Sequence, residues 1–582
     1  SAMTTAALSS MATLQIASFT SVQIGAVTTD SIGSLTTGEV KAIGSANLVG
    51  LSTNQIAYLV TAQLANMSTA QIAALSSVQI AAIETNDISA LKTAAILSLN
   101  SVQIGVITTD QIGSMTTDQV AAIGTDDLAG LTTAQIVALS TAQLSSMSTL
   151  QINSFTSTQI GAVATDDIGS LTTGEIVGIA SNNLVGLSTA QVAYLVTAQL
   201  ASMSTAQITA LNSIQVAAIE TNDISALTTK QIASLYSSQV NKLTTDQIVA
   251  LTTDQVMAVT SADLAAVASN YIPALTTAQV SVLKTAQVAG LTSTQLSQIE
   301  TNDISQLSAT AIAALSSVQV GAMGTAQIAS LATAQIAAII TADIAGITSD
   351  QVVGLSTAQI SALTTGQTYT FNSAQIQAIE TRDLINLTTA QVATLGSAQT
   401  SNLTSVQIAK LTTAQLSVLT TLQVSTLNST QVDALTSASI AVLTTKDFAA
   451  ITSANIATLS SVQIGALTTD QIVALTTDQA GAINSVAIAN LSTAQIAAIE
   501  TRDLIQLASN RVGVFTSTQI GALTTGEIAS MTSAQVTSIA SSSLFGLTTD
   551  QVVALVTAQV STITSTQLGA LTSIQVAAFE PK

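Results

Sequence analysis

Paired acidic residues are the side chains of this sequence best suited to bind a metal ion. The pairs are Asp126 with Asp127, Asp166 with Asp167, Glu220 with Asp223, and Glu300 with Asp303. Their carboxylate oxygens are the ligands that Ca²⁺ prefers. The sequence contains neither an EF-hand loop nor a calcium-binding nonapeptide repeat rich in glycine and aspartate, so we expect these acids to lie at helix ends or in solvent. No metal-binding residue is predicted.

Side chains that perform catalysis are scarce. Histidine, cysteine and tryptophan are absent, and Asp, Glu, Lys and Arg together make up 7% of the 582 residues. The sequence has no glycine-rich phosphate loop, no nucleophile elbow and no Cys/His metal cluster. We therefore expect no enzyme, no catalytic residue and no bound cofactor. Without cysteine, the fold must be stable without disulfides.

Net charge and hydropathy limit the kinds of partner that this chain could bind. Lys and Arg number 11 against 31 Asp and Glu, which gives a net charge of −20. Such a chain repels polyanions, so we predict no nucleic-acid partner. Mean hydropathy is high, at +0.57. However, Ser, Thr, Gln or Asp interrupts every apolar run well before the roughly 18 residues that a membrane span needs, and no span is predicted.

An eight-residue unit determines where all of these residues lie. Leu131-Thr132-Thr133-Ala134-Gln135-Ile136-Val137-Ala138 is typical, and the unit repeats in one frame over residues 3–578, where (579 − 3)/8 gives 72 octads. We number the positions of each octad one to eight. A period so short and strict predicts one continuous elongated array instead of several globular domains. Residues 1–2 resemble cloning residues, and residues 579–582 would begin a truncated octad.

Each octad carries the signals of a helix start. Thr132 at position two and Gln135 at position five form a capping box, while Leu131 and Ile136 occupy the positions of a hydrophobic staple. Acidic residues at position four, such as Asp110, suit the first helical turn. Positions three to eight would then give a helix of about six residues. The predicted fold is an all-α solenoid of very short helices, about five to six residues each, one per octad.

Helices this short are not stable alone, so neighbouring octads must stabilise one another. We expect the apolar residues at positions one and six to form a continuous core. Small residues at positions seven and eight would allow successive turns to approach closely. A β-solenoid is the alternative, because Thr, Ile and Val favour strands. The opposite parity of positions one and six on a strand, together with the abundance of Ala and Gln, counts against it.

Larger blocks also repeat. Residues 18–91 reappear as residues 154–227, an offset of 136 residues or 17 octads, and a third, weaker copy begins at Phe515. An acidic octad, Ile-Glu-Thr-Asn/Arg-Asp, begins at Ile83, Ile219, Ile299, Ile379 and Ile499. The last four are separated by 80, 80 and 120 residues, all multiples of 40. This spacing suggests a superhelical turn of five octads that presents the acids on one side.

Some residues depart from the pattern. The tyrosines are too sparse to form a stacking track, and we expect them at the core edge or isolated on the surface; they are Tyr58, Tyr194, Tyr236, Tyr271 and Tyr369. Residues 267–274, with Asn270, Tyr271 and Pro273, and residues 363–370, with Thr368 at position six, predict local kinks. The Thr-Thr pairs could form an ice-binding array, but their hydroxyls are better explained as helix caps.

The uninterrupted Leu-Thr-Thr-x-Gln-Ile/Val-x-Ala units resemble the octapeptide-repeat regions of giant bacterial secreted or cell-surface proteins of the adhesin type. This resemblance implies an extracellular or cell-surface structural role. We therefore expect a rigid spacer or scaffold, or a filament- or layer-forming segment, whose partners are other copies or neighbouring domains of the same large protein. The alternative is an α-solenoid scaffold that binds a protein or peptide in a superhelical groove.

Overall fold

The computed structural model describes residues 3–579 and divides the chain into two compact units, Ser1–Leu291 (unit 1) and Thr292–Lys582 (unit 2). Within the described residues all regular structure is helical, with 68 α-helices, four 3-10 helices and no strand. The all-α prediction is confirmed and the β-solenoid alternative is wrong. Residues 1–2 and 580–582, which include the predicted cloning residues and most of the truncated octad, lie outside the described residues.

One helix occupies each octad. Every α-helix begins at position three and ends at position six, seven or eight, so its length is four to six residues. Unit 1 runs from α1 (Thr5–Ser9) to α32 (Thr285–Gly290), and unit 2 from α33 (Ser293–Ser297) to α68 (Ser573–Ala577). The 3-10 helices are η1 (Ser45–Gly50), η2 (Leu128–Gly130), η3 (Ser181–Gly186) and η4 (Ser269–Ala274). No helix between residues 3 and 579 is both long and apolar enough to cross a bilayer.

The capping box determines where each helix begins. Before α15 (Thr133–Ala138), Thr132 is extended, with φ −76° and ψ 160°. Its Oγ1 accepts the backbone N–H of Gln135 at 3.3 Å, and the Gln135 Oε1 accepts the N–H of Thr132 at 2.6 Å. The N–H of Leu139 then closes the helix on the carbonyl of Ile136 at 3.2 Å. Both hydrogen bonds predicted from the Thr-x-x-Gln spacing are therefore present.

The core is a continuous column of position-one and position-six side chains. Leu131 and Ile136, the predicted staple pair, are 4% and 2% exposed. Position six is buried in the first octad as well, where Leu8 is fully inaccessible to solvent. The expected two-position core is confirmed in both units. A buried aliphatic side chain contributes about 1.5 to 3 kcal/mol, so stability accumulates octad by octad.

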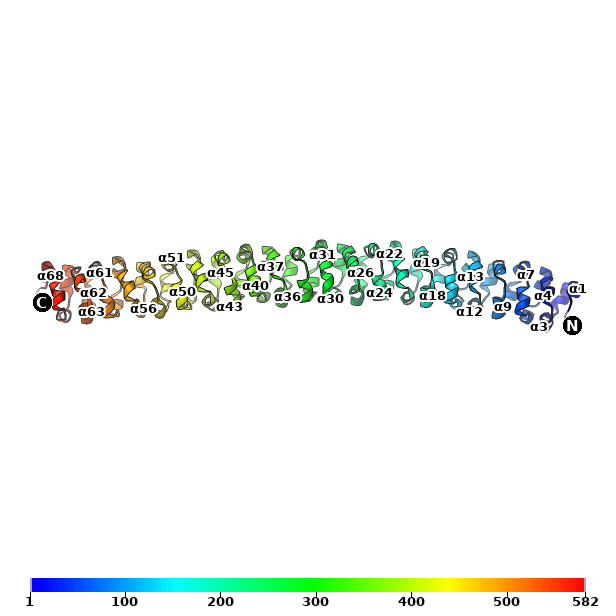
Figure 1. Ribbon diagram of the computed structural model, residues 1–582, viewed down its shortest axis with the longest axis horizontal. Helices are drawn as coiled ribbons and strands as arrows, with labels where there is room; N and C mark the ends of the chain where they lie inside the picture. Colours follow the sequence, from blue (N-terminus) through cyan, green and yellow to red (C-terminus); the bar gives the residue numbers. More distant parts are fainter. Residues whose placement is uncertain (1–2, 580–582) are drawn as a thin grey trace. The chain divides into compact units, whose positions relative to one another are not determined.

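Successive turns pack at a spacing of three octads. In unit 1, α15 contacts α18 (Ser157–Ala162), and in unit 2, α62 (Thr525–Ser530) contacts α65 (Thr549–Ala554). Within each unit the helices follow one another around a common axis in this way (Figure 1). The inter-turn hydrogen bonds described below reach back 28 residues, so a turn contains between three and four octads. The predicted five-octad turn is wrong.

Glycine allows the closest approach between turns. Gly25 ends α3 (Ser21–Gly25), and Gly50 ends η1. A Cβ atom on Gly50 would collide with the carbonyl oxygen of Ser21, and one on Gly25 would collide with that of Gly50. The same arrangement recurs at Gly105 with Gly130, Gly161 with Gly186, Gly321 with Gly346, and Gly521 with Gly546. Small residues at positions seven and eight have the predicted role.

The two atypical octads behave differently. In residues 267–274 the helix is the 3-10 helix η4, which contains Pro273. In residues 363–370 the helix is α42 (Thr365–Thr370), an α-helix of full six-residue length. Thr368 is 1% exposed, and its Oγ1 donates to the Thr365 carbonyl at 3.0 Å. The helix backbone itself satisfies the buried hydroxyl.

Candidate functional site

The side chain at position five joins one turn of the solenoid to the previous turn. Gln135 is 2% exposed, and its Nε2 donates to the carbonyl oxygens of Ile107 at 2.6 Å and Ile104 at 2.9 Å. Its Oε1 remains bonded to the N–H of Thr132. One amide therefore caps its own helix and also binds the end of a helix 28 to 31 residues earlier.

Only the first of these roles is predictable from the capping-box spacing. Glu would complete a capping box as well as Gln does, and it does so at Glu175, whose Oε2 accepts the Thr172 N–H at 2.7 Å. Most octads nevertheless have Gln. That preference for an amide over a carboxylate was the available signal, since only the amide also donates. Each buried hydrogen bond contributes about 1 kcal/mol net, and leaving its partner unsatisfied costs more.

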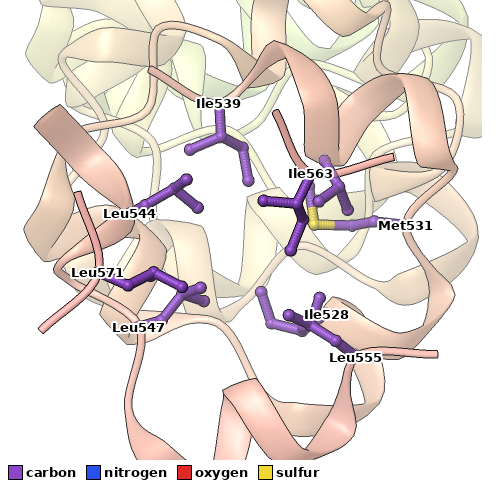
Figure 2. Close-up of a pocket in the computed structure, with 9 residues that line it drawn as sticks. Ile528, Met531, Ile539, Leu544, Leu547, Leu555, Ile563 and Leu571 are labelled. Atoms are coloured by element: carbon purple, nitrogen blue, oxygen red, sulfur yellow. The ribbon is translucent and has the colours of Figure 1, made fainter. Parts of the chain in front are cut away.

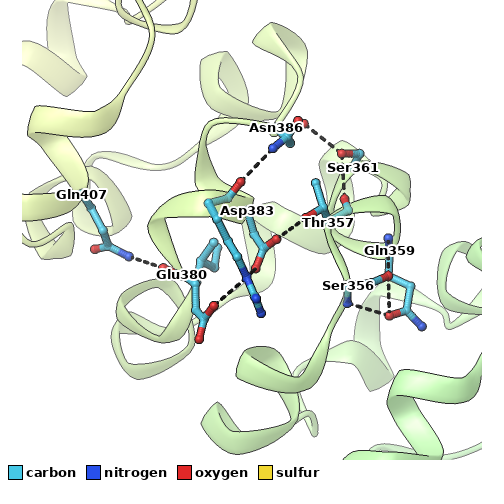
Figure 3. Close-up of polar contacts among 10 residues, drawn as sticks. Ser356, Thr357, Gln359, Ser361, Glu380, Asp383, Asn386 and Gln407 are labelled. Carbon is cyan, nitrogen blue, oxygen red and sulfur yellow. Dashed lines mark hydrogen bonds and ion pairs between the residues drawn. The ribbon is translucent and has the colours of Figure 1, made fainter.

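Several octads have Asp at position five, and most of these carboxylates form a different bond between turns. Asp383 of α44 (Thr381–Leu384) is 2% exposed and accepts the hydroxyl of Thr357 of α41 (Thr357–Ala362) at 2.5 Å. Figure 3 shows this contact beside the amide of Gln359. A hydroxyl 26 residues earlier is the donor at Thr61 with Asp87, Thr141 with Asp167, Thr197 with Asp223, Ser237 with Asp263, and Thr421 with Asp447.

The predicted acidic pairs do not act as pairs. Glu220 is exposed at the N-cap of α25 (Thr221–Ile224), whereas Asp223 is 7% exposed and is bonded to Thr197. Asp166 is likewise exposed beside a buried Asp167. These acids lie at the start of their helices, as expected, but Asp167 and Asp223 are also buried and accept hydroxyls of the previous turn. Within residues 3–579 no three acidic side chains come together as a metal site would require.

Two carboxylates at position five are less well satisfied. Asp503 is 1% exposed, neither of its carboxylate oxygens has a hydrogen-bond partner, and the Arg502 Nε lies 3.7 Å from Oδ1. Burial raises the pKa of Asp503. Thr477 and Arg502 lower it, but by less than burial raises it. Burial also raises the pKa of Glu527, although its carboxylate accepts the Thr524 N–H at 2.5 Å.

Arginine side chains add little stability to the acidic octads. The Arg382 Nε lies 2.7 Å from Glu380 and 3.4 Å from Asp383, and Arg502 lies 2.7 Å from Glu500. The Arg382 side chain is 68% exposed. An ion pair this open to solvent contributes at most about 1 kcal/mol. These contacts therefore lie on the surface of the fold without defining a binding site.

The tyrosines occupy unrelated places. Tyr58 and Tyr194 lie at position eight, Tyr236 at position two and Tyr369 at position seven, and all four are more than half exposed. Tyr271, at position five, is partly buried. With no common octad position, they form no continuous row on which bases or rings could stack. The predicted isolated placement agrees with this arrangement.

The cavities are small and apolar. One of about 30 Å³ is lined by core residues of residues 240–275, including Tyr271. Another, of about 10 Å³, lies among aliphatic side chains of residues 528–571, which point toward one another (Figure 2). Ligand pockets occupy about 300 to 1,000 Å³, so neither cavity has room for a cofactor. Wider surface grooves, open to solvent, lie between successive turns, for example between residues 297–302 and 324–327.

The octad pattern also matches a known repeat. A family model described as the ALTTAQ repeat matches ten segments of 38 residues each, 380 of the 582 residues in all. The segments are 40–77, 80–117, 120–157, 216–253, 256–293, 296–333, 336–373, 376–413, 440–477 and 496–533. The chain belongs to the ALTTAQ repeat family. One ALTTAQ segment covers nearly five octads, so it is longer than a single superhelical turn.

Other comparisons add little. A solved structure titled "Structure of APUM23-GGAAUUGACGG" covers 69% of this chain and 84% of its own, with 13% sequence identity and a TM-score of 0.15. A likeness at this level gives no basis for assigning that protein's ligand to the ALTTAQ array. No curated protein matches the sequence.

Proposed function

We propose that this ALTTAQ array is a noncatalytic structural spacer or scaffold within a bacterial secreted or cell-surface protein. One observation carries the proposal: the same inter-turn contact recurs octad after octad in both units. Each octad is positioned by neighbours about one turn away. In such arrays stability is a sum of repeat and nearest-neighbour terms, and length can change without a change of design.

The duplicated block supports this role. Residues 18–91 and 154–227 contain corresponding helices in the same order, including η1 and η3, and the same glycine contacts at Gly25–Gly50 and Gly161–Gly186. Insertion of 17 octads has therefore repeated the local structure without disturbing it. A spacer accommodates such insertions, whereas a catalytic site depends on fixed distances between particular residues. Neighbouring domains and other copies of the chain are the partners that a spacer requires.

A deletion in frame tests the proposal. Removal of residues 18–153 joins Ala17 to Ser154, the counterpart of Ser18, and takes out 17 whole octads. We expect unchanged circular dichroism per residue and a maximum dimension, from small-angle scattering, that falls in proportion to the octads removed. The control deletes residues 18–149, which shifts the frame by half an octad, and should disrupt folding at the junction.

Two results would contradict the spacer. One is loss of folding in the in-frame deletion, and the other is catalytic turnover by the purified chain. The surface location has its own test, because antibodies raised against the array should label intact cells of the source bacterium. Labelling only after the cells are lysed would refute the proposed location.

A further inference from the structure

Two successive octads of unit 1 lack the glutamine that joins one turn to the previous turn. Position five is Asp263 in the first of them and Tyr271 in the second. In the octads on either side, Gln255 and Gln279 each donate to carbonyls 28 and 31 residues earlier. Asp263 instead accepts the Ser237 hydroxyl at 2.6 Å, and the side chain of Tyr271 has no hydrogen bond in the described part of the chain.

The core is looser around these two octads. Six core side chains between residues 248 and 275 are 6% to 8% exposed, whereas those from Leu35 to Leu243 and from Val280 to Leu291 are at most 5% exposed. The six are Ile248, Leu251, Val259, Leu264, Val267 and Leu275. The apolar cavity of about 30 Å³ lies among the same side chains. A void removes van der Waals contacts from the side chains around it, so the turns attract one another less strongly here.

The missing amides alone do not explain the looser core. In unit 2, the octad of Ala311 and the octad before it also lack Gln, yet Ile312 is fully inaccessible to solvent. A 3-10 helix is not the cause either, because Leu48 in η1 is equally inaccessible. Pro273 is exposed. The remaining difference is Tyr271, which is partly buried, lines the cavity and has a larger side chain than the amide that it replaces.

We propose that the solenoid has a hinge at the interface between residues 232–251 and residues 259–275, which we call the Tyr271 interface. The carbonyls of Leu235 and Leu243, 28 residues before Asp263 and Tyr271, receive no glutamine amide there. In a repeat array each contact between turns contributes separately to stability, so this pair of turns can separate while its neighbours in unit 1 stay closed. Opening lets the array bend or lengthen at one defined place. The spacer role requires no such place.

Hydrogen exchange of the full chain, followed by mass spectrometry, tests the hinge. The comparison segment is residues 187–216, also in unit 1, where every octad has Gln at position five. We expect backbone amides of the Tyr271 interface to exchange at least about tenfold faster than those of the comparison segment. Equal rates in the two segments would overturn the proposal. This comparison uses the unaltered chain and does not depend on the folding of any variant.

Tyr271→Gln tests the cause. The new amide can donate to the carbonyls of Val240 and Leu243, so exchange at the Tyr271 interface should slow about tenfold. Tyr58→Gln is the matched control, because Tyr58 is 55% exposed and lies outside this interface, and it should leave the exchange rates there unchanged. Circular dichroism checks that both variants are folded.

Two results with these variants would contradict the hinge. One is unchanged exchange at the Tyr271 interface in Tyr271→Gln, and the other is an equal effect of Tyr58→Gln. The spacer proposal is tested separately, because its in-frame deletion removes residues 18–153 and leaves the Tyr271 interface in place.

Discussion

The Nε2 atom of Gln135 lies 2.6 Å from the carbonyl oxygen of Ile107, which precedes it by 28 residues. The Oε1 atom of the same side chain holds the N–H of Thr132 at 2.6 Å. A single residue therefore connects the beginning of one helix to the end of another in the turn before. This explains how helices of four to six residues persist, since none would be stable alone in water.

Replacing Gln135 by Glu separates its two roles. The carboxylate still accepts the Thr132 N–H, as Glu175 accepts that of Thr172, but at neutral pH it cannot donate to Ile104 or Ile107. We expect a local loss of roughly 1 to 3 kcal/mol, measured by hydrogen exchange of the amides in α15. Thr132→Ala is the comparison and should cost about 1 kcal/mol, because it removes only a cap. No measurable cost of Gln135→Glu would indicate that the bond between turns contributes nothing.

Thr357→Ala should leave the Asp383 carboxylate buried without its hydroxyl donor. We expect destabilisation of roughly 1 to 3 kcal/mol, seen as a lower midpoint of thermal unfolding. Thr389 also lies at position three, at the start of α45 (Thr389–Thr394), but the residue 26 places after it is Gln415. Thr389→Ala is therefore the matched control and should be close to neutral. Equal effects of the two changes would argue against the proposed role of the hydroxyl.

Gly50→Ala should force the two turns apart, because the new Cβ atom would collide with the Ser21 carbonyl oxygen. Overpacking of this kind typically costs about 1 to 3 kcal/mol. Gly38 of α5 (Thr37–Ala42) has nothing within 4 Å of an added Cβ atom. Gly38→Ala should instead stabilise the chain by about 0.5 to 1 kcal/mol through helix propensity. Chemical denaturation compares the two variants, and a tolerated Gly50→Ala would show that the turns can separate freely.

Glu527→Gln should stabilise the chain at neutral pH. Burial raises the pKa of Glu527 in the folded state above its ordinary value of 4.5. Its contribution to stability is therefore fully present below pH 4.5 and is lost as pH rises through the folded-state pKa. The amide that replaces this carboxylate would be neutral throughout and could donate to carbonyls of the previous turn, as Gln551 donates to Ile520 at 3.1 Å.

Thermal unfolding from about pH 4 to about pH 8 measures this effect. We expect the stabilisation by Glu527→Gln to grow with pH to roughly 1 to 2 kcal/mol. Asp433 is exposed, so Asp433→Asn provides a control for simple loss of charge. A gain that is constant with pH, or that is matched by the control, would rule out the buried carboxylate as its cause.

The sequence predicts the local structure of this protein better than its long-range geometry. Thr132, Gln135, Leu131 and Ile136 indicate the cap and the core because their partners lie within one octad. The number of octads per turn depends on the bend at every cap, which no residue type states directly. The 80-residue spacing of the acidic octads was misleading because it does not correspond to the superhelical turn.

The polar contacts between turns are also difficult to predict from the sequence. The acceptors of each Gln amide are backbone carbonyls, which any residue supplies, so they leave no mark in the sequence. Asp383 and Thr357 are different, because both partners are side chains, and the same pairing 26 residues apart recurs in other octads with Asp at position five. That co-occurrence was visible in the sequence, but it could be interpreted only once the length of the turn was known.

Because amides and carbonyls carry no net charge, the bond that joins most turns has nothing to titrate and little for dissolved ions to screen. We expect a protein stabilised in this way to be similarly stable at high salt, at low salt and in mild acid. The octads of Asp503 and Glu527, where burial raises the carboxyl pKa, are the places where we expect stability to depend on pH.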